Sequence, residues 1–247
     1  MTQAVAAFGH RHLPRGWRHL GLQFAIWFGF AAAYQAARGL ADYGTTAPER
    51  AIHNGLRVIQ IEQGWNALYE LTFQRIADGY GLLHSAVYFT YWFSEFGVVG
   101  LGLLWIYFRR HHSFAQVRNT ILLANVIGLV GYISMPTAPP RFFSTFGFVD
   151  TQFAGTVEFL ANPYAAMPSL HAADAAIIGF ALAVSCRRWP LRILWALWPA
   201  WVAFSVMATA NHFWLDVAAG TLVAGIAAVL VYTYPLLKRR TSIANAL

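Results

Sequence analysis

Six long apolar runs dominate the sequence and limit the folds that this chain can adopt. They cover residues 20–37, 82–108, 117–135, 169–186, 191–210 and 213–237. Each is near or above the roughly 20 residues that a helix needs to cross a bilayer. Hydrophobic residues make up 58% of the 247 residues and charged residues only 11%, which excludes a soluble fold, a disordered chain and a disulfide scaffold. The sequence predicts an all-α, polytopic membrane protein with a six-transmembrane-helix bundle.

The segments between these runs alternate in charge, and the alternation predicts an orientation. One set carries only cations: Arg11, Arg15, Arg18, Arg109, Arg110, Arg118, Arg187, Arg188, Arg192, Lys238, Arg239 and Arg240. The other set holds most of the carboxylates: Asp42, Glu49, Glu62, Glu70, Asp78, Asp150 and Glu158. By the positive-inside rule both termini are cytoplasmic, and the loops 38–81 and 136–168 face outward. The net charge of +7 therefore indicates orientation, and we expect no nucleic-acid partner.

This organisation predicts one integral membrane catalytic domain over residues 1–247, placed in the plasma membrane, with residues 1–19 as a cytoplasmic tail. The first run follows basic residues and could belong to a signal peptide. Its apolar stretch is longer than the usual core of about 7–15 residues, so we expect it to be a retained anchor.

The outer loop 38–81 has a helical pattern of its own. Thr46-Ala47-Pro48-Glu49 resembles a capping box with Pro near the helix start. Apolar residues then recur at roughly helical spacing: Ile52, Leu56, Ile59, Trp65, Leu68 and Leu71. We expect an amphipathic helix at the membrane interface, broken near Gly55 or Gly64, whose simplest role is to cover the bundle.

Three polar stretches lie at the outward ends of the third, fourth and sixth runs. They are Pro136-Thr137-Ala138-Pro139-Pro140-Arg141, Pro168-Ser169-Leu170-His171 and Asn211-His212-Phe213-Trp214-Leu215-Asp216. A six-span bundle can bring all three together at one depth. This convergence is the strongest functional signal in the sequence.

His212 and Asp216 are four residues apart, so they share one helix face. A carboxylate there can hold one imidazole nitrogen and leave the other as a nucleophile. The alternative is a structural hydrogen bond that satisfies two polar groups in the membrane. Ionisable residues inside spans are costly, which favours a functional role.

The other two stretches suit a bound anion. Pro168 and Ser169 predict the start of the fourth helix, where backbone N–H groups and the helix dipole favour negative charge. Ser169 alternatively serves as a cap only, and His171 as an interface residue. Arg141 suits a phosphate, although an outer-interface Arg also often extends toward lipid phosphate.

Together these residues resemble the type 2 phosphatidic acid phosphatase superfamily. The resemblance rests on Ala165-Ala166-Met167-Pro168-Ser169-Leu170-His171, followed by Asn211-His212-x-x-x-Asp216. The Leu of Pro-Ser-Leu-His and the Ala-Pro-Pro-Arg turn look like the inositol phosphorylceramide synthase branch of that superfamily. The similarity extends from about Ala47 to Leu237.

The resemblance implies phosphoryl transfer through a phosphohistidine, with no metal and no other cofactor. By match to the family motifs, His212 is the nucleophile, and Asp216 orients it. His171 protonates the leaving oxygen and then activates the acceptor hydroxyl. Arg141, Ser169 and the backbone N–H groups near Leu170 hold the phosphoryl oxygens. The implied partners are a phospholipid substrate within the bilayer and a lipid or water acceptor, while the oligomeric state stays open.

The chain departs from the phosphatase branch in its cations. That branch has a Lys six residues ahead of its first Arg-Pro pair and a second Arg before the nucleophilic His. Here Lys238 is the only Lys, and no Arg lies between Ser205 and Ala210. A single motif cation favours a phosphodiester donor such as phosphatidylinositol. Hydrolysis of phosphatidic acid or a polyprenyl phosphate is the alternative.

Four further polar residues border the predicted site. Asp174 lies three residues after His171 and can bind a polar head group or tune that imidazole. Glu95 lies within the second run. Either is otherwise a hydrogen-bonded structural acid. Tyr164 and Asn211 are candidate head-group or acceptor contacts, or only caps and interface residues.

Two other classes of protein remain open at this point. An intramembrane serine protease would use Ser169 and His212 as a dyad, but no Gly-x-Ser-Gly surrounds Ser169 and Arg141 would have no role. A transporter or metal-binding protein could use His171, His212 and Asp216, but Arg141 would repel a cation. The phosphotransferase reading gives every motif residue a role.

Overall fold

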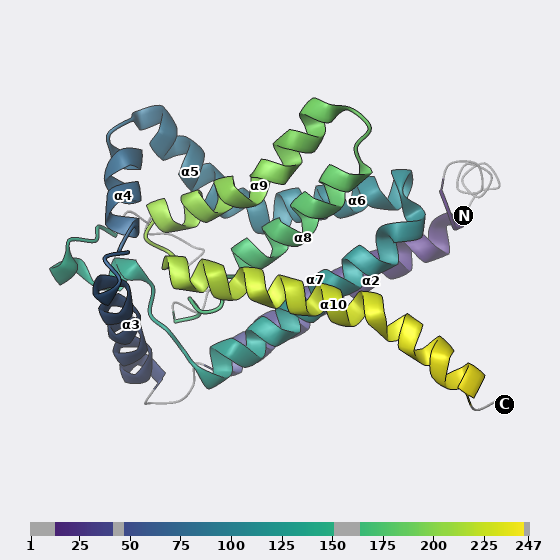
Figure 1. The fold of residues 1–247 in the computed structure, drawn as a ribbon, viewed down its shortest axis with the longest axis horizontal. Helices are drawn as coiled ribbons and strands as arrows, with labels where there is room; N and C mark the ends of the chain where they lie inside the picture. The colour runs from purple at the N-terminus through teal and green to yellow at the C-terminus, as the bar shows by residue number, and fades with distance from the viewer. Residues whose placement is uncertain (1–12, 42–46, 151–163, 245–247) are drawn as a thin grey trace.

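The computed structural model describes residues 13–41, 47–150 and 164–244, and its regular elements there are helices (Figure 1). They are α2 (Gly16–Ala41), α3 (Ala47–Gly64), α4 (Glu70–Asp78), α5 (Gly81–Phe93), the π-helix η1 (Ser94–Val98), α6 (Val99–Arg109), α7 (His111–Ser134), the short 3₁₀ helices η2 (Pro140–Phe142) and η3 (Ser144–Phe146), α8 (Leu170–Ser185), α9 (Trp189–Ala208) and α10 (Trp214–Ala244). The predicted all-α class is confirmed.

Four helical stretches in the described ranges are long and apolar enough to cross a membrane. They are Gly81–Arg109, His111–Ser134, Trp189–Ala208 and Trp214–Tyr234. The fourth predicted run forms α8, which has only 16 residues. The first run lies in α2, whose 26 residues include Arg18, His19, Gln23 and Gln35. The count of six spans therefore stays a prediction.

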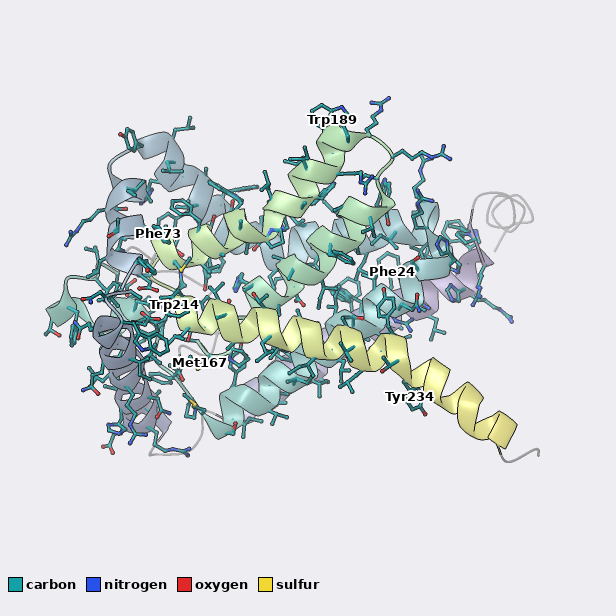
Figure 2. All side chains as sticks on the ribbon, viewed as in Figure 1. Phe24, Phe73, Met167, Trp189, Trp214 and Tyr234 are labelled. Atoms are coloured by element: carbon teal, nitrogen blue, oxygen red, sulfur yellow. The ribbon has the colours of Figure 1, made fainter. Side chains whose placement is uncertain are left out.

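Large apolar side chains of these helices lie on the outside of the bundle, among them Trp189 of α9 and Tyr234 of α10 (Figure 2). In the most apolar part of α9, and likewise of α10, only 28% of the residues are buried. Phe28, Phe180 and Leu222 are 66%, 70% and 64% exposed. Such a surface would aggregate in water but suits lipid chains. The protein is therefore a multi-pass membrane protein.

Helix α8 is the centre of the bundle. It packs against α6, α7, α9 and α10, and eleven of its sixteen residues are buried. Small residues permit this close packing, because a Cβ on Gly102 of α6 would lie 2.7 Å from Ile178 of α8. Helix α2 begins and α10 ends at one end of the molecule, whereas α3 and α4 lie at the opposite end (Figure 1).

The segment between α2 and α5 contains two helices. Helix α3 ends at Gly64, so the predicted break near Gly64 is confirmed, whereas a break at Gly55 is wrong. Gly55 instead allows a close approach, since a Cβ there would lie 2.7 Å from the carbonyl oxygen of Ala138. Of the predicted capping box, Thr46 lies outside the described residues. The interfacial position of α3 stays a prediction.

Three consecutive backbone N–H groups at the start of α10 each donate to a buried carboxyl group. The pairs are Phe213 with Asp216 Oδ2 (2.8 Å), Trp214 with Glu70 Oε1 (2.6 Å) and Leu215 with Glu62 Oε1 (3.2 Å). These N–H groups have no backbone partner within the helix, and the helix dipole favours negative charge beside them. Helices α3 and α4 thus hold the first turn of α10.

Burial makes the two glutamates unusual acids. Glu62 and Glu70 are both 0% exposed. Burial raises the pKa of Glu62 above its ordinary value, and the nearby Glu70 carboxyl adds to this rise. Burial likewise raises the pKa of Glu70, with a smaller contribution from Asp216. Both side chains therefore retain protons at a higher pH in the folded protein than in the unfolded chain.

Helices α8 and α10 also meet through their backbones. The N–H of Ser169 donates to the carbonyl oxygen of Asp216 at 2.9 Å. One turn further along α10, a Cβ on Gly220 would lie 2.0 Å from the carbonyl oxygen of Ser169. The chain at the start of α8 can therefore lie against α10 only because residue 220 has no side chain.

We predict that Gly220→Ala lowers the thermal melting temperature of the purified protein in detergent. The new methyl group would overlap backbone, which cannot rotate away, and such overpacking typically costs about 1–3 kcal/mol. Gly225→Ala is the matched control on the same helix, because its Cβ would meet no atom within 4 Å. Equal melting temperatures for the two variants would contradict the close contact.

We also predict that the melting temperature falls as the pH rises from about 5 to about 9. The folded-state pKa values of Glu62 and Glu70 are raised. As the pH rises, the unfolded chain therefore releases these protons at a lower pH than the folded protein does. Their contribution to stability is full below the ordinary Glu pKa and is lost as the pH rises through the folded-state values. Glu62→Gln and Glu70→Gln should flatten the decline, whereas Glu49→Gln, at an exposed position on α3, should not.

Candidate active site

The two histidines predicted from the sequence lie side by side. His171 is in the first turn of α8 and His212 lies just before α10. Their ring centroids are 5.6 Å apart, about two hydrogen-bond lengths. This separation allows both rings to reach one small group placed between them. The structure thus brings His171, His212 and Asp216 together, as the motif positions predicted.

The Nδ1 atom of His212 is held from two sides. It lies 2.9 Å from the carbonyl oxygen of Ala166 and 3.6 Å from Asp216 Oδ2. Since a carbonyl can only accept a hydrogen bond, Nδ1 carries the proton. In the neutral ring Nε2 then carries the lone pair that a nucleophile needs. We expected Asp216 to hold one imidazole nitrogen, and the Ala166 carbonyl lies closer to that nitrogen than Asp216 does.

Asp216 has a second task at the helix start. It occupies the third position of α10, and its Oδ2 accepts the N–H of Phe213, which is the carboxylate half of a capping box. The side chain is completely buried beside the nearly buried His212. The same carboxyl group therefore fixes the helix terminus and faces the imidazole.

His171 contacts a carboxylate and an aromatic ring. Its Nε2 lies 3.4 Å from Glu95 Oε2, and its ring stacks on Tyr91 with centroids 4.8 Å apart. Glu95 belongs to the π-helical turn η1, which interrupts α5 and α6. Such turns are frequent at functional sites. The sequence places Glu95 within the second apolar run, and the structure shows that it lies against His171.

Arg141 lies next to the residue that precedes His212. Its guanidinium donates to Asn211 Oδ1, and its backbone N–H donates to the carbonyl oxygen of Ala210 at 3.0 Å. Asn211 in turn donates to Thr209 Oγ1 at 2.9 Å. The 136–141 stretch is therefore tied to the 209–212 stretch, as their predicted convergence requires.

Ser169 caps α8. Its Oγ accepts the N–H of Ala172 at 3.3 Å, and the residue is 0% exposed. This geometry confirms the capping role and is not that of an accessible serine nucleophile. Leu170 is buried against α7, where a Cβ on Gly128 would lie 2.6 Å from its side chain. Phosphate binding by Ser169 and by the backbone near Leu170 stays a prediction.

Asp174 and Tyr164 each have contacts of their own. Asp174 is 4% exposed, and both its oxygens accept from Asn125 Nδ2 of α7, at 3.0 and 3.1 Å. Tyr164 lies beside Phe142, with ring centroids 5.7 Å apart. Its carbonyl oxygen accepts the N–H of Thr137. Head-group contact by either residue stays a prediction.

Several residues of the site were missed by sequence reasoning. Glu62 and Glu70 looked like the polar face of an amphipathic cover, yet they bind the start of α10. Asn125 was available as a signal, because it is an amide within an apolar run.

Among the described residues, no three His, Cys, Asp or Glu side chains are grouped so that they could hold a metal ion.

Comparison with known proteins relates the sequence that forms this site to a family. A phosphoinositol dihydroceramide synthase from Bacteroides thetaiotaomicron is 28% identical over 159 residues, which cover 56% of this chain and 52% of that protein. The chain thus spans about half the length of this curated relative. No solved structure matches the chain. The sequence profile of the PAP2 superfamily matches residues 56–230, which include both histidines, Arg141 and Asp216, and the protein therefore belongs to the PAP2 superfamily.

Proposed function

We propose that this protein is a lipid phosphotransferase of the plasma membrane. It moves a phospho-alcohol group, of the phosphoinositol kind, from a phospholipid to the hydroxyl group of a second lipid. The observation that carries the proposal is the pairing of His212, held at Nδ1 by the Ala166 carbonyl, with His171 at 5.6 Å. The name of the Bacteroides relative supports an inositol head group and a ceramide-like acceptor.

The first half of the reaction transfers the group to the protein. His212 Nε2 attacks phosphorus, a P–N bond forms, and the bond to the diacylglycerol oxygen breaks. His171, protonated beside Glu95, donates its proton to that leaving oxygen. Asp216, close to His212 Nδ1, stabilises the positive charge that the ring acquires.

The second half reverses these steps with a different alcohol. His171, now neutral, takes the proton of the acceptor hydroxyl, whose oxygen attacks phosphorus. The P–N bond breaks and His212 returns to its neutral form. With water in place of the lipid hydroxyl the same steps give hydrolysis, so the choice of acceptor depends on what occupies the space beside His171.

The phosphoryl oxygens need positive charge as the bonds change. Arg141, linked to Asn211 beside His212, supplies one cation. The first turn of α8 supplies backbone N–H groups and the positive end of its dipole. Positioning and charge of this kind account for most of the catalysis of phosphoryl transfer.

We predict that His212→Ala abolishes both turnover and the covalent adduct that forms when the donor carries labelled phosphorus. Asp216→Asn should retain measurable activity, because this side chain orients the ring and forms no bond to phosphorus. His53→Ala, at an exposed position on α3, is the control. A labelled adduct that survives His212→Ala would rule out His212 as the nucleophile.

The number of cations points to the class of donor. A phosphomonoester carries nearly two negative charges at neutral pH, whereas a diester carries one. Of the loop arginines, Arg50 donates to the carbonyl oxygen of Ser134, and Arg57 and Arg75 are exposed. Arg141, bonded to Asn211, is the cation that the sequence motifs bring beside His212.

We predict that phosphatidylinositol is turned over faster than phosphatidic acid in the same detergent, with both products of each donor followed. The reason is that Arg141 balances the single charge of a diester but not the charge of a monoester. Faster turnover of phosphatidic acid would contradict this charge argument and would make the protein a lipid phosphate phosphatase.

A further inference from the structure

We infer that helix α2 completes a binding site for the lipid whose hydroxyl oxygen meets His171, first as the diacylglycerol that leaves and then as the acceptor. The site has two parts, a cavity beside His171 that carries a few polar groups and an apolar groove that adjoins it. The acceptor that this site fits is an N-acyl amino alcohol with two hydrocarbon chains. This inference rests on the proposed function.

The cavity has a volume of about 360 Å³ and lies between α2, the α5–η1 segment, α7 and α8. Its polar lining includes His171, Glu95, Asp174 and Asn125. The lining residues do not include His212. The cavity therefore lies on the His171 side of the site.

The groove has a volume of about 490 Å³ and lies between α2, the helix that runs from α5 into α6, and α7. Trp27 and Phe96 line both the groove and the cavity, so the two are neighbours. On α2 the groove runs from Leu20 to Phe28, about 12 Å of helix. Half of the hydrocarbon core of a bilayer is about 15 Å, so a lipid chain fits this length.

The chemistry of transfer explains why one site serves two lipids. In an in-line displacement the entering and leaving atoms lie on opposite sides of phosphorus. Since His212 is the partner in both half-reactions, the diacylglycerol oxygen and the acceptor oxygen occupy the same place opposite it. His171 exchanges one proton with each in turn. Diacylglycerol must therefore leave before the acceptor binds.

The polar groups of the cavity favour a particular lipid head. Carboxylate oxygens accept hydrogen bonds, and Glu95 and Asp174 both line the cavity. An N-acyl amino alcohol offers an amide N–H and hydroxyl groups as donors. A diacylglycerol offers one hydroxyl group, since its ester oxygens only accept. The acceptor should therefore bind more tightly than the leaving lipid.

Helix α2 lies outside the region that the superfamily profile matches. The superfamily profile begins at residue 56, whereas α2 ends at Ala41. The helix nevertheless supplies Trp27, Tyr34 and Gln35 to the cavity and Leu20 to the groove. The lipid-binding walls thus include a segment that precedes the region matched by the superfamily profile.

A photoreactive N-acyl amino alcohol, with a diazirine near the end of its acyl chain, tests the site on the full-length protein in detergent. The adducts should map to residues 20–28 of α2 or 99–104 of α6. Unlabelled N-acyl amino alcohol should displace the probe at about one tenth of the diacylglycerol concentration, given the extra hydrogen bonds to charged groups. Soluble inositol phosphate should not displace it.

A pair of glycine variants controls the test. Gly100 lines the groove, and a Cβ at Gly100 or at Gly225 would meet no atom within 4 Å. Gly100→Leu should fill the groove and reduce labelling at least about tenfold, whereas Gly225→Leu on α10 should leave it unchanged. Melting temperatures measured for both confirm that they fold.

The result is independent of turnover, because labelling needs no catalysis. Labelled residues in the groove, with no transfer from any phospholipid, would support the site and refute the proposed function. Transfer by the wild type with adducts elsewhere would refute the site alone. Displacement by inositol phosphate, equal displacement by the two lipids, or full labelling of Gly100→Leu would also overturn the inference.

Discussion

The first turn of α10 is the part of the structure on which the candidate site depends. Its N–H groups are held by Asp216, Glu70 and Glu62, and the carbonyl oxygen of Asp216 accepts the N–H of Ser169. His212 precedes this turn, and His171 follows the Ser169 cap of α8. Through these few hydrogen bonds, the segments that cover the end of the bundle determine the separation of the two imidazoles.

The meeting of the two histidines could be predicted because it follows from position along the chain. Residues at the outward ends of the spans share one depth, and a spacing of four places His212 and Asp216 on one face. The carbonyl of Ala166 as the partner of His212 Nδ1 could not be predicted in this way. Every residue has a carbonyl, and only the folded loop decides where it points.

Other parts of the site could not be predicted because their role comes from a distant partner. Glu62 and Glu70 sit in a helical pattern typical of a solvated face, and nothing local distinguishes them from Glu49. Gly55 suggested a helix break, yet its missing Cβ makes room for Ala138 and Phe143 while α3 continues. The contribution of α2 to the cavity beside His171 likewise depends on helix packing that periodicity does not encode.

The candidate site contains many acidic side chains, and any of them that is ionised would repel the anionic phosphate of the proposed substrate. Glu62, Glu70, Glu95, Asp174 and Asp216 all lie near the two histidines or the helix turns that carry them. At an effective dielectric constant of about 20, one carboxylate about 8 Å from a phosphate costs about 2 kcal/mol per negative charge. Burial keeps protons on Glu62 and Glu70 to a higher pH, which reduces this repulsion at the start of α10.

The net electrostatic energy of the bound phosphate also depends on the charge of the substrate. A diester brings half the charge of a fully ionised monoester, so the repulsion from the acids that stay ionised is halved, while Arg141 and the first turn of α8 still attract it. The carboxylates beside His171 also gain a use when the neighbouring ligand is rich in hydroxyl and amide donors. An acid-rich site with one motif cation therefore favours the proposed exchange of one alcohol for another on a phosphodiester over attack on a phosphate monoester.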